Sequence, residues 1–115
     1  MTKIFVGNKD GGDFLEIETM VDTGSLHTCL PTRTLERLHV AIEDSIAVEL
    51  ADGRITTRPT GEVAIRIDGR QRTCMVIFEE GTTCLLGATT LENFSLAADP
   101  VNQRLIPTTL RARPL

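Results

Sequence analysis

The segment Phe14–Val21 (FLEIETMV) is the feature that most narrows the possible folds, because its residues alternate between two faces. The positions that suit a core are Leu15, Ile17, Thr19 and Val21. The intervening positions include two glutamates, which favour solvent. A period of two is typical of a β-strand with one buried face. We therefore expect a strand here whose apolar set points inward.

The same strand signal recurs along the chain in short runs between turn-forming residues. Further strands are expected at Lys3–Gly7, Ser45–Leu50, Arg54–Arg58, Gly61–Ile67, Arg72–Phe78, Ser95–Pro100 and Gln103–Pro107. Turns are expected at Asn8–Asp13, Asp68–Gln71 and Pro100–Asn102, and Pro59 predicts a bend or a sheet edge. Short helices are expected at Pro31–Leu38 and Ala88–Phe94. The pattern predicts one mainly β domain, a barrel or a sandwich.

Composition limits both the core and the possible partners. The 115 residues include four Phe but no Tyr or Trp, so the core must be aliphatic. Without aromatic platforms, and with a net charge of −4 and no basic block, a nucleic-acid partner is not expected. Glu79, Glu80, Arg111 and Arg113 are expected to be solvated charges.

The cysteines and histidines do not form a metal-binding pattern. Cys29, Cys74 and Cys84 are odd in number and lack C-x-x-C spacing, and His27 and His39 stand outside any zinc motif. We expect buried, reduced thiols, no metal and no organic cofactor. His27 is expected on the surface or on a pocket wall. No signal-peptide pattern or membrane-length apolar run is present, so we expect a cytoplasmic protein with no membrane partner.

Asp22 directly follows the alternating strand and begins the triplet Asp22-Thr23-Gly24. One interpretation is an ordinary turn, in which the aspartate caps its own backbone. The other is a carboxylate held for chemistry, since two carboxylates that share one proton provide a base and an acid side by side. The chain has one such aspartate, and a second copy related by two-fold symmetry would supply the other.

Three segments carry a resemblance to a known family. They are MVDTGSLHTCLP (Met20–Pro31), CLLGATTLENFSLAADP (Cys84–Pro100) and, between them, VELADGRITTRPTGEVAIRI (Val48–Ile67). In this order they resemble the single-domain, retropepsin-like (clan AA) aspartic proteases. The likeness covers about residues 4–107 and implies that 1–115 is a single protease domain. It also implies a closed, mainly antiparallel barrel with one or two short helices, assembled as a symmetric homodimer.

The resemblance also implies roles for individual residues. Asp22 would be the catalytic aspartate, and Thr23 would hydrogen-bond across the dimer axis. Gly24 would let its backbone amide approach the carboxylate, and the Ser25 hydroxyl could hydrogen-bond the aspartate. Leu85, Leu86 and Gly87 would pack beneath this loop, and Ala51, Asp52 and Gly53 would form the tip of a flap over bound peptide.

The chain departs from the retroviral pattern at two linked positions. Retroviral members usually place an arginine after the glycine of the second motif, paired with an acid just beyond the catalytic loop. Here those positions correspond to Ala88 and Leu26, so both partners are replaced together and no orphan charge results. The flap is also less rich in glycine.

The function implied is a homodimeric aspartic endopeptidase that hydrolyses peptide bonds through a water activated by paired Asp22 carboxylates. Its substrate would be a peptide or protein, with hydrophobic side chains flanking the cut. Two alternatives stay open: a non-catalytic module that binds peptides or regulates another protein, and a protease domain that trims its own termini.

Overall fold

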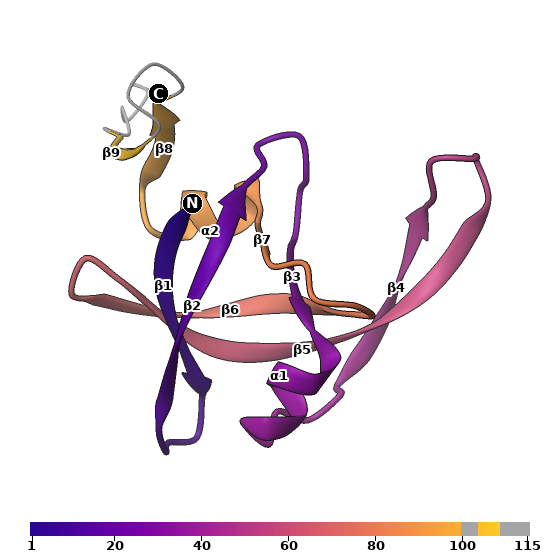
Figure 1. Cartoon of the computed structure of the whole chain (residues 1–115), viewed down its shortest axis with the longest axis horizontal. Helices are drawn as coiled ribbons and strands as arrows, with labels where there is room; N and C mark the ends of the chain where they lie inside the picture. Colours follow the sequence, from indigo (N-terminus) through magenta and orange to yellow (C-terminus); the bar gives the residue numbers. More distant parts are fainter. Residues whose placement is uncertain (100–103, 109–115) are drawn as a thin grey trace, which may run out of the picture.

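The computed structural model describes residues 1–99 and 104–108 of the chain. The described part of the fold, shown in Figure 1, consists mostly of β-strands and has two short helices. In chain order they are β1 (Thr2–Asn8), β2 (Phe14–Val21), β3 (Thr28–Pro31), α1 (Thr32–Arg37), β4 (Asp44–Glu49), β5 (Ile55–Ile67), β6 (Arg70–Glu79), β7 (Leu85–Leu86), α2 (Ala88–Asn93), β8 (Leu96–Asp99) and β9 (Arg104–Pro107).

The strand pairings form a ring. Going round the main sheet, the order β1-β2-β7-β3-β6-β5 returns to β1, because β1 also pairs with β5. Most pairs are antiparallel, and the parallel ones are β2–β7 and β3–β6. β4 pairs with β5 outside the ring, and β8 and β9 form a separate antiparallel pair. The chain is therefore mainly antiparallel, as expected, and its pairings close on themselves.

The core lies inside this ring and is aliphatic, apart from two phenylalanines. The side chains of Ile4, Val6, Leu30, Val63, Ile65, Val76, Leu86 and Phe94 are fully buried. The inward face expected for β2 is confirmed, since Thr19 is buried and Leu15, Ile17 and Val21 pack against the core. Cys74 is buried, whereas Cys29 and Cys84 are only half-buried, which corrects the expectation of three buried thiols.

The Asp68-Gly69 turn is confirmed and fixes the β5–β6 register. Both residues have positive φ, 50° and 78°, and Ile67 pairs directly with Arg70 across the turn. Positive φ at both central positions matches the right-handed twist of a two-residue hairpin. This tight turn sets which residues of β5 and β6 face the core.

Two strand expectations were incomplete. The runs on either side of Pro59 form one continuous strand, β5, which pairs with β4 over its first half and with β6 from Thr60 onward. Pro59 therefore lies where one side of β5 lacks a β6 partner, so its missing N–H does not interrupt that ladder. β3 was not expected, and Pro31 ends that strand and occupies the position just before α1 instead of beginning the helix.

The remaining expectations concern the chain after Gly87 and possible membrane spans. The helix expected after Gly87 is confirmed as α2, and the two closing strands are β8 and β9. The turn expected at Pro100–Asn102, and Arg111 and Arg113, lie outside the described residues. Neither helix of the described part has the length or the apolar run that a bilayer span requires.

Candidate functional site

The loop that carries Asp22 begins where β2 leaves the ring. Val21 pairs with Leu86 of β7, and the backbone N–H of Asp22 donates to the carbonyl oxygen of Leu86 at 3.1 Å. One step earlier, the N–H of Met20 donates to the carbonyl of Cys84 at 2.9 Å. The two segments singled out in the sequence therefore lie side by side, and the second fixes the point at which Asp22 enters its loop.

Asp22 is half-buried and bonds back to its own turn. Its carboxylate Oδ1 accepts a hydrogen bond from the Gly24 N–H at 3.0 Å, and its carbonyl accepts one from the Ser25 N–H at 3.1 Å. A Cβ at Gly24 would lie 3.3 Å from Oδ1. Among the described residues no other group hydrogen-bonds this carboxylate, so one oxygen is oriented while the group stays accessible. The same bond is what the ordinary-turn interpretation requires.

The far side of the loop is held by the start of α2. The N–H groups of Ala88 and Thr89 donate to the carbonyls of Ser25 and Leu26, each at 2.9 Å. These are the positions where retroviral relatives were expected to use an arginine and an acid. Here backbone hydrogen bonds connect the two segments. The loop therefore stays attached to α2 although this ion pair is missing.

Gly87 allows this contact because the backbone of another segment lies against it. A Cβ built on Gly87 would lie 2.5 Å from the His27 carbonyl oxygen and 2.9 Å from the Thr28 nitrogen. Such distances leave no room for any side chain. The glycine of the second motif is therefore required by close packing of two backbones.

A buried pair of threonines lies beneath the loop. Thr28 Oγ1 accepts the Gly87 N–H at 3.0 Å and lies 2.6 Å from Thr90 Oγ1. Thr28 and Thr90 are 0% and 1% exposed, so their hydroxyls need hydrogen-bond partners inside the protein, which they find in each other, in the Gly87 N–H and in the Cys74 thiol. Sequence reasoning missed this pair, because the two threonines are 62 residues apart in the chain and no local pattern links them.

The Ser25 hydroxyl does not take the partner that the resemblance implied. A hydrogen bond to the Asp22 carboxylate was expected, but this hydroxyl donates to the His27 carbonyl at 3.0 Å. The turn bond from the Ser25 N–H to the Asp22 carbonyl holds the residue at the end of the turn, where its side chain reaches forward along the chain. Ser25 thus stabilises the loop without contacting the carboxylate.

Ala51, Asp52 and Gly53 form the exposed tip of the β4–β5 hairpin. The turn closes through Leu50 N–H to Arg54 carbonyl at 2.7 Å, and Gly53 adopts φ 85°. The Asp52 carboxylate accepts the Arg54 backbone N–H at 3.0 Å and pairs with its Nε at 2.6 Å. These bonds lower the pKa of Asp52 below its ordinary value, and the bond from the Arg54 backbone N–H has the largest effect. Figure 1 shows this hairpin and the β2–β3 loop projecting toward the same side of the molecule.

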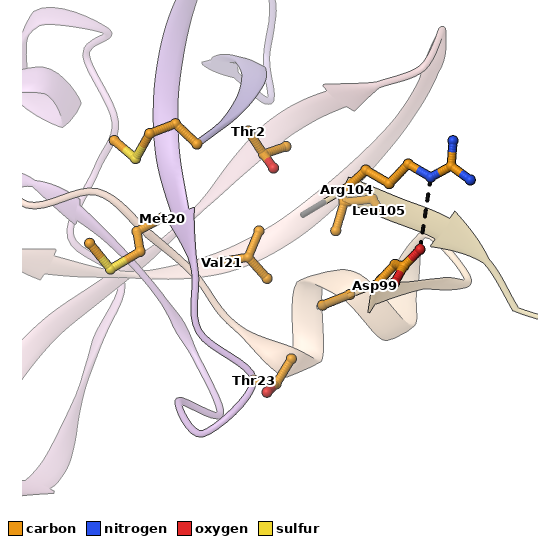
Figure 2. A pocket seen from close by; sticks show the side chains of 9 residues that line it. Thr2, Met20, Val21, Thr23, Asp99, Arg104 and Leu105 are labelled. Carbon is orange, nitrogen blue, oxygen red and sulfur yellow. Dashed lines mark ion pairs between the residues drawn. The ribbon is translucent and has the colours of Figure 1, made fainter. Parts of the chain in front are cut away.

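Two cavities flank the Asp22 loop. The first, of about 350 Å³, lies between the end of β2 and the β8–β9 pair. Figure 2 shows Val21 and Thr23 on its wall, with the Asp99–Arg104 ion pair, 3.9 Å apart, across from them. Met1 and Met20 also line this cavity and are 79% and 54% exposed. An apolar surface next to Thr23 is thus open to solvent in the single chain.

The second cavity, of about 370 Å³, lies between the loop and the stem of the β4–β5 hairpin. His27 is on its wall, as expected. Glu79 was expected to be solvated, but its side chain is 30% exposed and pairs with Arg58 at 3.9 Å on the same wall. Arg58 and Glu79 come from different strands, so no local pattern could have predicted their meeting.

The part of the chain that the structure describes contains no group of three His, Cys, Asp or Glu side chains placed to bind a metal ion. The half-buried thiols of Cys29 and Cys84 and the buried thiol of Cys74 all have pKa values raised by burial. They are therefore neutral groups, and Cys29 lines the second cavity.

Comparison with known proteins supports a protease-like fold. The sequence model of a family described as aspartyl protease matches residues 8–90. No curated protein sequence matches the chain. Simian foamy virus (mac) protease superposes with a TM-score of 0.57 and 15% identity, over 81% of this chain and 94% of that one.

Two further solved structures are similar. The EIAV protease complexed with the inhibitor HBY-793 gives a TM-score of 0.61 and 18% identity, over 81% of this chain and 85% of that one. The foamy viral protease–reverse transcriptase in complex with an RNA/DNA hybrid gives 0.59 and 14%, over 96% of this chain and 13% of that one. At these identities the structural likeness shows a shared fold.

Proposed function

Because the chain belongs to the aspartyl protease family, we propose that it is a homodimeric aspartic endopeptidase in which residues 1–115 act as one domain. The observation that carries the proposal is Asp22 itself: a half-buried carboxylate at the end of β2, oriented by the Gly24 N–H and set in a loop bonded to β7 and α2. A single chain holds one such carboxylate, and the two-fold partner supplies the second.

The chemistry follows from two carboxylates sharing one proton. The ionised Asp22 removes a proton from a water, which attacks the scissile carbonyl carbon. The protonated Asp22 of the partner subunit donates its proton to the carbonyl oxygen, forming a tetrahedral diol. A proton then reaches the amine nitrogen, and the C–N bond breaks. Gly24 holds one carboxylate oxygen throughout.

The dimer arrangement is supported by the surface around Thr23. Met1 and Met20 are exposed apolar side chains lining the cavity that Thr23 also lines. Exposed apolar surface beside polar groups favours contact with another protein surface. A second copy placed there would cover these methionines and bring the two Asp22 loops together.

The substrate would lie extended between the Asp22 loop and the β4–β5 hairpin, which project toward the same side. An extended peptide of about six to eight residues can bind such a groove by main-chain hydrogen bonds, as an added strand does. The tip residues Ala51–Gly53 would then close over it as a flap. We assign the substrate class as peptides or unfolded protein segments.

We further propose a cytoplasmic location. Cys29, Cys74 and Cys84 are all free thiols, which is the usual state of cysteine in a reducing compartment.

Replacing the proposed catalytic aspartate provides the first test. Asp22→Asn keeps the shape of the side chain but cannot act as a base, so cleavage of a mixed peptide pool should fall by about 10³-fold or more. Mass spectrometry of the products measures this. Asp13→Asn, at an exposed aspartate in the β1–β2 loop, is the matched control and should cleave normally. Peptides retained by the wild type without any product would instead identify a binding module.

The dependence on pH provides the second test. Since the pair must hold a single proton, kcat/KM should peak in mild acid and fall as the pH rises toward neutral. The pKa of Asp52 is lowered, so its carboxylate stays ionised at any pH above that lowered value. The hydrogen bonds that it accepts from Arg54 at the flap tip therefore persist from mild acid to neutral pH. Initial rates measured from about pH 3 to 8 test this profile. A rate that keeps climbing above neutral pH would rule out the shared-proton mechanism.

A further inference from the structure

The cavity between the Asp22 loop and the β4–β5 hairpin has a partly apolar wall. Leu26 comes from the loop, Val48 and Leu50 from the hairpin, and the buried Ile77 from β6. Cys29 adds a neutral thiol, because burial first of all raises its pKa. The cavity measures about 370 Å³, enough space for a large side chain. Since it adjoins the loop that carries Asp22, a peptide bound for cleavage would place a side chain here.

The wall of this cavity also carries charges. Arg58 of β5 and Glu79 of β6 face each other with 3.9 Å between Nη2 and Oε1, and their side chains are 27% and 30% exposed. At this separation the pair makes no direct hydrogen bond. The donors of the guanidinium and the acceptors of the carboxylate are thus available to a third group. Glu49, an exposed residue of β4, adds a second carboxylate to the lining.

Each class of substrate side chain meets this pair differently. An apolar side chain would displace water from two charged groups and replace none of their hydrogen bonds, which is costly. A carboxylate would gain Arg58 but face Glu79 and Glu49. A cation would gain those two acids but face Arg58. A neutral amide can accept from Arg58 and donate to Glu79 at once.

We propose that Arg58 and Glu79 make this cavity a specificity subsite that selects an amide side chain, Gln or Asn, at one position of the substrate. The inference rests on the proposed function, because it concerns the groove beside Asp22. It changes one expectation drawn from the sequence, namely that the side chains flanking the cut are hydrophobic. At this one position the polar pair outweighs the apolar part of the wall.

The test is a cleavage profile on a peptide library derived from a digested proteome, read by mass spectrometry. The wild type should show one position near the cut enriched in Gln and Asn, by about 10-fold over Leu. Glu79→Gln leaves Arg58 unpaired and should shift that position toward Asp and Glu. Arg58→Gln leaves the acids in excess and should shift it toward Lys and Arg. The double variant Arg58→Met/Glu79→Leu should shift it toward apolar side chains, with the other positions unchanged.

A matched control comes from another ion pair. Lys3 and Glu16 lie 3.8 Å apart on the β1–β2 hairpin, with side chains 62% and 53% exposed, and do not line this cavity. The double variant Lys3→Met/Glu16→Leu should leave the cleavage profile as it is. An unchanged profile in all the Arg58 and Glu79 variants would overturn the subsite while leaving the protease function intact.

A second readout is independent of catalysis. The Asp22→Asn variant, immobilised and exposed to the same library, should retain peptides rich in Gln and Asn, and adding Arg58→Met/Glu79→Leu should remove that enrichment. If the wild type cuts nothing but this retention is seen, the proposed protease fails and the subsite stands. Retention without an amide preference, or no retention and no cleavage, rejects the subsite.

Discussion

At the scale of single residues, two glycines in the site are constrained for different reasons. Gly87 faces the His27 backbone so closely that any Cβ would overlap it. Gly24 has more space, and its nearest neighbour would be the Asp22 carboxylate oxygen at 3.3 Å. The first glycine therefore belongs to the packing of the fold, and the second to the orientation of the proposed catalytic group.

Substituting these glycines should separate stability from activity. Gly87→Ala forces two backbones apart and should lower the free energy of unfolding by about 1–3 kcal/mol, as overpacking of a full site does. Equilibrium urea unfolding at fixed protein concentration measures this.

Gly24→Ala serves as the comparison. Its unfolding free energy should stay within about 0.5 kcal/mol of wild type, as for substitutions away from packed sites, because the new methyl meets only one side-chain oxygen. Its cleavage rate should fall, since that methyl presses on the carboxylate. Equal loss of stability in both variants would contradict this distinction.

At the scale of elements, the site is a junction of β2, β3, β7 and α2. Backbone bonds from β7 and α2 hold both ends of the Asp22 loop. Beneath it, the hydroxyls of Thr28 and Thr90 join β3 to α2. This packing explains why the second motif must follow its glycine with a helix, whose first N–H groups reach the loop carbonyls.

The threonine pair should show strong coupling. Thr28→Val leaves the buried Gly87 N–H without its partner and removes the Thr28–Thr90 hydrogen bond, so it should cost about 1–3 kcal/mol of unfolding free energy. Thr90→Val removes the bond to Thr28 and the contact with the Cys74 thiol but leaves the Gly87 N–H paired, so it should cost less. Because both single variants remove the same Thr28–Thr90 hydrogen bond, which the double variant loses only once, its cost should fall short of the sum. Additive losses in urea unfolding would mean that the two hydroxyls act independently.

Elements also show where sequence reasoning succeeded. The alternation in Phe14–Val21 and the Asp68-Gly69 turn are local signals, and both appear as expected in β2 and in the β5–β6 hairpin. β3 was missed because its four residues pair in parallel with β6 and are mostly buried, so no alternation marks them. Pro59 predicted a bend or a sheet edge, and β5 continues through it because its pairing with β6 begins only at Thr60.

At the scale of the whole molecule, the ring of strand pairings encloses one core and leaves the Asp22 loop and the β4–β5 hairpin on the same side. In the proposed dimer two such rings meet beside Thr23, where Met1 and Met20 are exposed. Each protomer then holds half of one active site, so activity becomes a property of the pair.

Mixing subunits tests that dependence. If wild type and Asp22→Asn subunits exchange freely, each active dimer needs two wild-type chains, so an equal amount of variant should reduce activity to about half and a ninefold excess to about a tenth. Initial cleavage rates at constant wild-type concentration measure this, with Asp13→Asn as the added control. Activity that is unaffected by any excess of Asp22→Asn would show that one chain carries a complete site.

The sequence by itself determined the strand periods, the tight Asp68-Gly69 turn, the two short helices and the positions of both motifs, because these depend on residues near one another along the chain. Only the tertiary structure decided that Leu86 and Ala88 hold the Asp22 loop, that the Ser25 hydroxyl bonds to His27, and that Arg58 meets Glu79. Most of these contacts join residues from different segments of the chain. The Ser25 bond depends on how a side chain is oriented within a turn. Their distances depend on strand register and packing, which no local pattern specifies.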